Sequence, residues 1–128
     1  MILDTSVLVA ILCDEPEAEE FEGALAADDV RLLSAASLLE ASIVIEARFG
    51  EEGRLELDRL LETAAVQVVA VTRDQIEIAR EAHRRFGKGR HPARLNFGDC
   101  FPYALSKLSG EPLLFKGEDF SRTDLDLV

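Results

Sequence analysis

Short apolar runs alternate along this chain with longer segments in which apolar residues recur at helical spacing. The mostly apolar or β-branched runs predict strands at residues 1–3, 30–34, 66–71 and 112–115, and the tail at 124–128 is a candidate fifth strand. Amphipathic segments predict helices at residues 6–15, 17–28, 35–50, 51–65, 72–87 and 100–110. This alternation favours an α/β fold with a mainly parallel sheet of four to five strands.

Local signals predict where several of these helices begin and end. Gly50 is the expected C-terminal cap of the segment 35–50, and Gly87 closes the segment that begins at the N-cap residue Thr72. Pro102 fits the last helix only in its first turn, where a missing backbone N–H is tolerated. The stretch between Gly87 and that helix is expected to be a loop.

Length and composition are typical of one folded domain, which we expect to span residues 1–128. Hydrophobic residues make up 48% and charged residues 30% of the sequence, which argues against a disordered chain. No apolar stretch approaches the ~20 residues that span a bilayer, and no secretory leader is recognised, so we expect a cytoplasmic protein without a membrane segment. Cys13 and Cys100 lie far apart and are interpreted as reduced core thiols, and with only two histidines, His83 and His91, a His-rich zinc site is not expected.

The net charge of −11 argues against a polyanionic partner, but the charge is unevenly spread. Eight acidic and no basic residues lie between Asp14 and Asp29, whereas six of the fourteen Lys and Arg residues lie between Arg80 and Arg94 with one acid, Glu81. Two interpretations remain open. The basic segment is either a solvated helix face or a local basic rim on an acidic molecule.

Two aspartates stand at ends of predicted elements. Asp4 follows the first strand, and the carboxyl ends of parallel strands are where α/β folds bind ligands. Asp99 lies at the start of the last helix, after a glycine that allows close approach of the backbone. Each aspartate could instead serve only as a helix cap.

Two further acids complete the set. Glu40 lies within an apolar helical segment, where a carboxylate is costly to bury unless it is paired or bound to a cation, although it could also belong to a narrow polar stripe. Asp119 follows the last confident strand and could be an ordinary turn residue. If the fold gathers all four acids, their repulsion calls for a cation, and oxygen ligands of this kind suit Mg²⁺ or Mn²⁺. Such a site suits phosphodiester hydrolysis.

The sequence around these acids resembles the PIN-domain ribonucleases, and within them the VapC-type toxins of VapBC toxin–antitoxin systems. The resemblance covers essentially the whole chain and is carried by the segments "ILDTSVLVAIL", "AASLLEASIVIEAR", "LNFGDCFPYALSK" and "PLLFKGEDFSRTDL". It implies a three-layer α/β/α fold and a Mg²⁺- or Mn²⁺-dependent endoribonuclease that cleaves structured RNA, such as tRNA or rRNA, and inhibits translation. It also implies a cognate VapB-type antitoxin and a homodimer.

Carried over by position, the resemblance assigns roles to individual residues. Asp4 and Asp99 would be the metal ligands, and Glu40 and Asp119 would complete the catalytic acids, with Glu118 as the alternative to Asp119. Supporting hydrogen bonds are expected from Thr5 or Ser6 and from Asn96. From the charge pattern we further expect contacts with RNA phosphates at Arg84, Lys88, Arg90 and Arg94.

Two other interpretations stay open at this point. A phosphate-handling α/β protein, such as a dehalogenase-like phosphatase or a response-regulator receiver, also carries an aspartate after its first strand. The phosphatase pattern requires a second aspartate where this chain has Ser6, and the acidic pair of a receiver is missing. A PIN-like module that binds RNA or a partner without catalysis is the second alternative, against which the complete set of acids argues.

Overall fold

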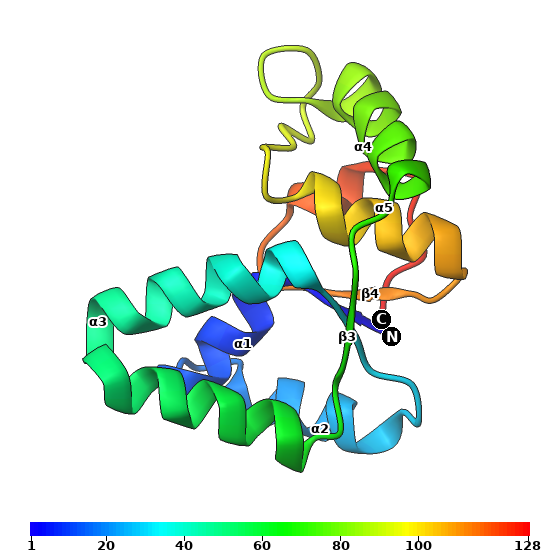
Figure 1. The fold of residues 1–128 in the computed structure, drawn as a ribbon. Coiled ribbons are helices and arrows are strands. Elements are labelled where there is room, and N and C mark those ends of the chain that lie inside the picture. The colour runs from blue at the N-terminus through cyan, green and yellow to red at the C-terminus, as the bar shows by residue number, and fades with distance from the viewer.

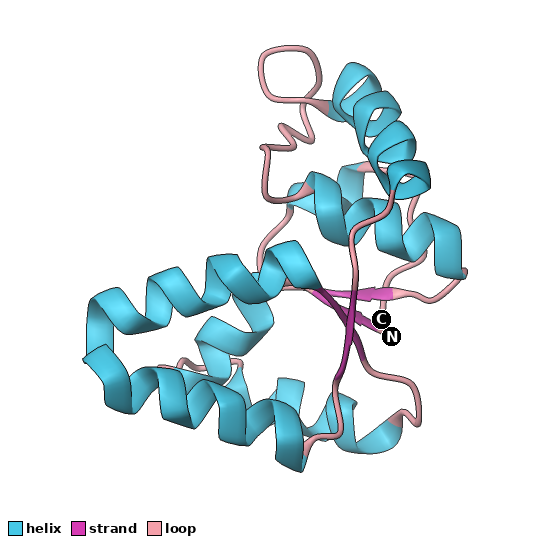
Figure 2. Cartoon of the chain, in the orientation of Figure 1, coloured by secondary structure: helices cyan, strands magenta, loops and turns pink.

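The computed structural model describes residues 1–128 and contains a four-stranded, all-parallel sheet with five α-helices around it (Figures 1 and 2). The strands are β1 (Ile2–Leu3), β2 (Leu32–Ser34), β3 (Gln67–Val69) and β4 (Leu113–Leu114). The helices are α1 (Thr5–Leu12), α2 (Ala18–Ala27), α3 (Ala35–Thr63), α4 (Arg73–Phe86) and α5 (Cys100–Ser109), followed by the 3₁₀ turn η1 (Asp119–Arg122). The predicted α/β fold with a parallel sheet is confirmed.

The strand order is β3-β2-β1-β4, so the chain steps outward from β1 to β3 and then returns to the other side of β1. Ile2 pairs with Leu32 of β2 on one side and with Leu113 of β4 on the other. The order of the strands therefore switches between β1 and β4. In open parallel sheets, the crevice beyond the carboxyl ends at such a switch is the usual place for a ligand.

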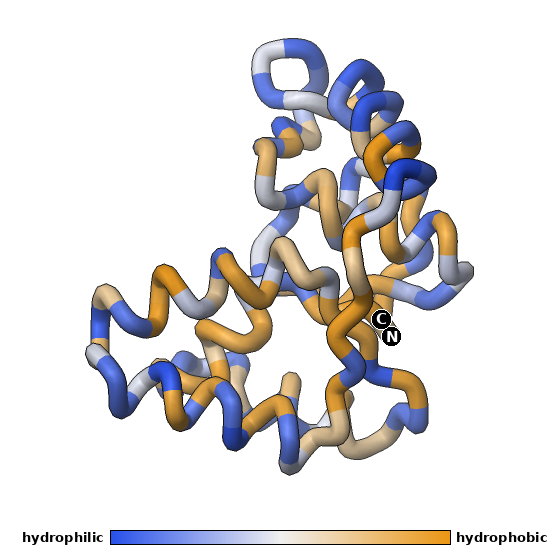
Figure 3. The backbone as a smooth tube through the Cα atoms, in the orientation of Figure 1, coloured by the Kyte–Doolittle hydropathy of each residue, from blue (hydrophilic) through white to orange (hydrophobic).

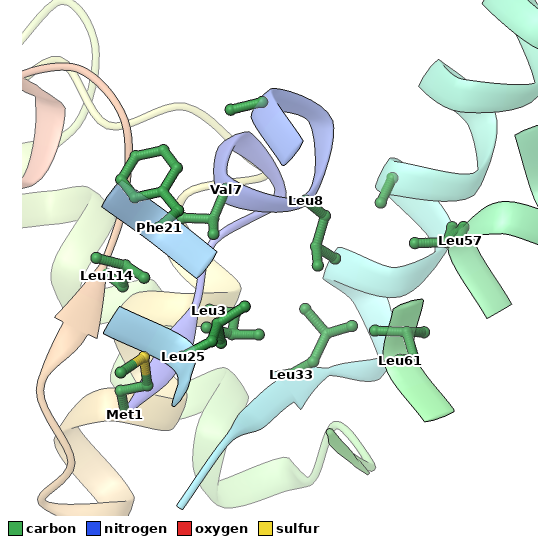
Figure 4. Packing of buried hydrophobic residues seen from close by; sticks show 12 residues of the cluster. Met1, Leu3, Val7, Leu8, Phe21, Leu25, Leu33, Leu57, Leu61 and Leu114 are labelled. Atoms are coloured by element: carbon green, nitrogen blue, oxygen red, sulfur yellow. The ribbon is translucent and has the colours of Figure 1, made fainter. Parts of the chain in front are cut away.

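Alternation along the short strands separates two cores, one on each face of the sheet. Leu3 and Leu114 point toward α1, α2 and the second half of α3, where they pack with Phe21 and Leu57 (Figure 4). Their neighbours in sequence point the other way, into a cluster under α4 and α5 that contains Ile2, Leu113, Phe86, Tyr103 and Phe120. Helices on both faces give the expected three layers, and the strands at the centre of the molecule are strongly hydrophobic (Figure 3).

Helix α3 contains both of the helices predicted for residues 35–65. Gly50, at φ 65° and ψ −150°, interrupts the helical geometry, so the two halves fold back on each other as a hairpin (Figure 1). Gly53 lets the halves approach, because a Cβ atom there would lie 2.8 Å from Ile45 Cγ2. The predicted boundary at Gly50 is therefore confirmed.

Other element limits differ in detail from the prediction. The first helix ends at Leu12 rather than residue 15, because Asp14 adopts a left-handed conformation with φ 50° that cannot continue a helix. Helix α4 begins after Thr72, whose side chain accepts a hydrogen bond from the Gln75 amide, and ends before Gly87 as predicted. The candidate fifth strand amounts to one bridge between Leu127 and Leu113. None of the helices is long and apolar enough to cross a membrane.

Candidate active site

Asp4 and Asp99 are both buried, with exposed fractions of 8% and 9%, at the carboxyl edge of the sheet. Asp4 follows β1 directly, and its backbone N–H donates to Leu114 O of β4 at 3.0 Å. Asp99 immediately precedes α5, which packs across the sheet. The predicted strand-end position of Asp4 therefore coincides with the switch in strand order.

Ser6 fixes the Asp4 carboxylate. The Ser6 amide and hydroxyl both donate to Asp4 Oδ2, at 3.1 and 2.5 Å, and Ser6 Oγ accepts from the Lys116 amide at 2.9 Å. Asp4 thus caps α1, as the simpler interpretation proposed, but these bonds use one carboxylate oxygen and leave Oδ1 available. Burial raises the pKa of Asp4 above its usual value, against the hydrogen bonds from Ser6 that lower it.

Asn96 holds Asp99 in a similar way. The Asn96 amide donates to Asp99 Oδ2 and the Asp99 amide donates to Asn96 Oδ1, both at 3.0 Å. The Asp99 side chain makes no capping bond to α5, so the helix-cap alternative is not what the structure shows. Asp99 Oδ1, like its counterpart on Asp4, accepts no hydrogen bond.

The pKa of Asp99 links it to the other three acids. This pKa is raised to about 7, mainly by burial and also by repulsion from the carboxylates of Asp4, Asp119 and Glu40, against the bond from the Asn96 backbone amide, which lowers it. Because this repulsion requires proximity, the fold brings together all four acids that the sequence singled out.

Glu40 and Asp119 approach the buried pair from the exposed rim. Glu40, on the first half of α3, is exposed, and its carboxylate lies so close to Gly98 that a side chain there would collide with it. Asp119 is exposed at the start of η1 and lines a cavity of about 380 Å³ that Glu118 also lines. The charge of Asp119 is one of those that raise the pKa of Asp99.

The residues expected to support the acids or to bind RNA differ in the contacts they make. Thr5 Oγ1 donates to Ser37 O at 3.2 Å and so joins α1 to α3, whereas Ser6 orients Asp4. Arg84 is held by Glu81, with an Nη2–Oε2 distance of 2.6 Å. Arg94 lines the same cavity as Asp119. Exposed positions in the loop after α4 are occupied by Lys88 and Arg90.

Two residues near the acids were missed by sequence reasoning. Lys116 supplies the amide that bonds to Ser6, and Arg122 lines the cavity beside Asp119. Arg122 stands three positions after Asp119 in one short 3₁₀ turn, which is the signal that could have identified it. Lys116 carried no such signal, because its contact joins residues 110 positions apart.

The donor set suits a hard divalent cation bound by few protein ligands. No three His, Cys, Asp or Glu side chains are arranged to hold a metal ion by themselves. Asp4 and Asp99 instead each offer one carboxylate oxygen that accepts no hydrogen bond. Mg²⁺ is often bound through one or two carboxylates with water and phosphate oxygens in the remaining positions.

Comparison with known proteins agrees with this geometry. The PIN domain family matches residues 1–125. Over all 128 residues the chain is 62% identical to ribonuclease VapC30 of Mycobacterium tuberculosis, covering 98% of that protein, and 62% identical to ribonuclease VapC of Mycolicibacterium smegmatis, covering 99%.

Solved structures show the same fold. The crystal structure of the M. tuberculosis toxin VapC20, described as cleaving the sarcin–ricin loop, superposes with a TM-score of 0.80 at 22% identity and covers 99% of this chain and 97% of that one. A toxin–antitoxin complex from Klebsiella pneumoniae contains a chain with a TM-score of 0.72 at 17% identity, covering 99% and 95%. The family match and the full-length identity together show that this chain belongs to the PIN-domain family, among the VapC ribonuclease toxins of toxin–antitoxin systems.

Proposed function

We propose that this protein is a Mg²⁺- or Mn²⁺-dependent endoribonuclease that cuts structured RNA, tRNA or rRNA, and so inhibits translation in the cytoplasm. The observation that carries the proposal is the pair of buried aspartates, Asp4 and Asp99, each with one unbonded oxygen at the switch in strand order. The likeness of fold to a toxin described as cleaving the sarcin–ricin loop supports a folded RNA as substrate. One PIN domain over residues 1–128 is consistent with the match to residues 1–125.

Asp4 and Asp99 would hold the cation, which supplies a Lewis acid that activates water and neutralises charge on the phosphate. Ser6 and Asn96 keep the two carboxylates oriented and supply hydrogen bonds that favour their ionised forms. Glu40 and Asp119 complete the catalytic acids from the exposed rim, where a carboxylate can accept a proton from water. Asp119 is favoured over its neighbour Glu118 because the charge of Asp119 is among those that raise the pKa of Asp99.

Attraction for RNA is proposed to come from the basic residues near this centre. Lys88, Arg90 and Arg94 form no ion pair in the structure, so their charge is available to phosphates. Arg84 is also a predicted phosphate contact, although its pairing with Glu81 offsets part of its charge. These four residues lie on α4 and in the loop that leads to Asp99.

A homodimer and a cognate VapB-type antitoxin are the proposed protein partners. The first half of α3 exposes Leu39 and Ile43 at 62% and 60%, and Phe97 beside them is 80% exposed. These side chains line one cavity of about 390 Å³ with Glu40 and Phe101, and an exposed apolar group of side chains beside the acids supports an interface between copies. The likeness to a chain in a toxin–antitoxin complex supports the antitoxin.

One alternative from the sequence is excluded and one is addressed by the site. Membership of the PIN family excludes the phosphatase and the receiver. Against a PIN-like module without catalysis stand the four gathered acids and the identity to proteins named ribonucleases.

The test compares cleavage of total cellular RNA by the wild type, Asp4→Asn and Asp99→Asn, with added Mg²⁺ or Mn²⁺ and with excess EDTA. We expect cleavage by the wild type with metal, none in EDTA, and a loss of at least about a hundredfold in each variant. Asp29→Asn, which changes an exposed aspartate outside the site, should cleave as the wild type does. Cleavage by both site variants at the wild-type rate would refute the assignment.

A further inference from the structure

Arg94 and Arg122 meet at one cavity although they are far apart in the sequence. The cavity, of about 380 Å³, is also lined by Pro92, Ala93, Glu118 and Asp119. Arg94 comes from the loop before Asp99, and Arg122 ends η1, so each arginine follows or precedes one of the four acids by a few residues. Both arginines are exposed. The pair therefore stands at the rim of the acidic centre.

Neither guanidinium has a partner within the chain. Arg80 and Arg84 on α4 are each paired with a glutamate one turn away, Glu77 and Glu81. Arg94 and Arg122, by contrast, make no ion pair and no side-chain hydrogen bond, even though two carboxylates line their cavity. An unpaired guanidinium presents a planar set of donors that matches the oxygens of a phosphate.

Buried neighbours fix the backbone at both positions. Arg94 has φ 56°, a left-handed conformation that a long side chain rarely adopts. It is held there by Leu95, which is fully buried and whose amide donates to Phe86 O at 2.9 Å. Arg122 follows the buried Phe120, and Leu95 and Phe120 belong to the same hydrophobic cluster. One core thus places both arginines.

From this geometry we propose that Arg94 and Arg122 form a phosphate subsite, which binds a backbone phosphate of the RNA strand adjacent to the phosphate cleaved at the acidic centre. The proposal rests on the proposed function and goes beyond it by naming the residues that position the strand. A polyanion approaching Asp119 in a protein of net charge −11 meets repulsion, and two unpaired cations on the approach offset it. Arg122 is a positioning residue here, since it would contact the strand and not the reacting atoms.

The experiment measures binding in an Asp99→Asn background, in which RNA is not cleaved, using a short fluorescein-labelled RNA hairpin as the probe. Arg94→Gln, Arg122→Gln and the double variant are compared across a salt series with Arg59→Gln, which removes the same charge from an exposed position on the second half of α3. Each arginine of the subsite should weaken binding about tenfold and lower the salt slope by about one unit. Arg59→Gln should change neither.

A second readout uses the cleaving enzyme with total RNA. Loss of a strand-positioning contact should raise KM and leave kcat within about twofold, because the contact is made equally before and during the reaction. Arg122→Lys, which keeps the charge but not the planar donors, should recover part of the lost affinity. Thermal unfolding checks the fold of each variant, and the exposed substitutions should leave the melting temperature unchanged.

The outcomes separate this inference from the proposed function. If the wild type cleaves RNA and the double variant keeps wild-type affinity and slope, the subsite is refuted and the ribonuclease stands. If the wild type cleaves nothing, the proposed function fails, and the hairpin measurements still decide the subsite. Variants that keep the wild-type affinity for RNA but no longer bind the antitoxin would also refute the inference, because the pocket would then serve a protein partner.

Discussion

Gly98 makes room for the Glu40 carboxylate beside the backbone that leads into Asp99. A methyl group at this position would overlap with the end of the Glu40 side chain, which is flexible and can move away. Gly98→Ala should therefore displace Glu40 without unfolding the protein. We expect ribonuclease activity to fall by about a hundredfold, as small misplacements of catalytic groups do, with little change in the melting temperature.

Gly23 provides the matched control, because a Cβ atom there meets nothing within 4 Å on the exposed face of α2. Gly23→Ala should leave activity unchanged and stabilise the fold by about 0.5–1 kcal/mol through the lower entropy of the unfolded chain. Activity assays and thermal unfolding on both variants give the comparison. Full activity in Gly98→Ala would show that the position of Glu40 does not matter.

Asp99 should make the metal-free protein less stable as the pH rises. Its pKa is about 7 in the fold against 3.8 for the ordinary carboxyl, so folding takes up a proton between these values. The folded state then binds more protons than the unfolded state, and stability is lost as pH increases from about 4 to 7. The variant Asp99→Asn removes this buried charge. Its melting temperature at about pH 8 should be higher than that of the wild type and should depend less on pH.

Mg²⁺ offers a separate check on the same residue. A cation that binds only the folded protein raises its melting temperature. With EDTA as the reference, Mg²⁺ should stabilise the wild type at alkaline pH and have little effect on Asp99→Asn. Equal stabilisation of both proteins would contradict the proposed role of Asp99 in holding metal.

Sequence reasoning located Asp4, Asp99 and Asp119 because their positions follow from strand and helix ends, and Glu40 because a carboxylate stood out in an apolar helical segment, both of which are local features. Asp4 follows a short apolar run, and Asp99 precedes a helix, so the carboxyl-edge rule was sufficient for both. It could not determine that Ser6 rather than Thr5 orients Asp4, because the two hydroxyls are adjacent and their partners lie elsewhere in the chain. Lys116 was missed for the same reason, since its amide bonds to a residue 110 positions away.

Helix limits were largely predictable and strand limits were less so. Thr72 and Gly50 act on their immediate neighbours, which is why the ends of α4 and the break in α3 matched the expectation. Residues 124–128 have the alternation of a strand but form one bridge to Leu113. Pairing depends on which backbone groups of a neighbouring strand remain open, and that information is spread over the whole chain.

The first half of α3 leaves the apolar side chains of Leu39 and Ile43 exposed beside Glu40, so the alternative of a narrow polar stripe around Glu40 does not describe this face. Replacing Leu39 and Ile43 by glutamate should break the proposed dimer, because two apolar contacts on each copy are lost and a symmetric interface would bring the new negative charges together. We expect the dissociation constant of the dimer to rise by about thirtyfold or more. Sedimentation measures this.

Leu55 provides the control for this prediction. It is 45% exposed on the second half of α3 and lies outside the cavity that Leu39 and Ile43 line. Leu55→Glu should leave the oligomeric state as it is in the wild type. If the Leu39 and Ile43 variant sediments as the wild type does, the copies associate through another surface or not at all.

Charge is unevenly distributed over this acidic molecule, and most of its cations form ion pairs within the chain. The chain has 25 acids and 14 Lys and Arg residues, and several of these cations are already paired within α3 and α4. The cations without ion pairs in the loop after α4, Lys88 and Arg90, lie close along the chain to Arg94 and the proposed phosphate subsite. A basic rim therefore exists on an acidic protein, formed by fewer residues than the sequence count suggested.

This distribution ranks the basic residues in a way that binding can test. Lys88→Ala combined with Arg90→Ala removes two unpaired charges, so RNA affinity in the Asp99→Asn background should fall and the salt slope should decrease by about two units. Arg84→Ala should lower the slope by less than one unit, because its guanidinium already donates to Glu81 and releases that carboxylate when it is removed. Arg59→Ala is the control, since that residue is paired on the exposed surface of the second half of α3.

Fluorescence anisotropy with one RNA hairpin across a salt series gives the slopes of the Asp99→Asn background and of the three variants made in it. Equal slopes for the Lys88 and Arg90 variant and for the control would show that the loop is an ordinary solvated surface, and that attraction for RNA arises elsewhere on the molecule.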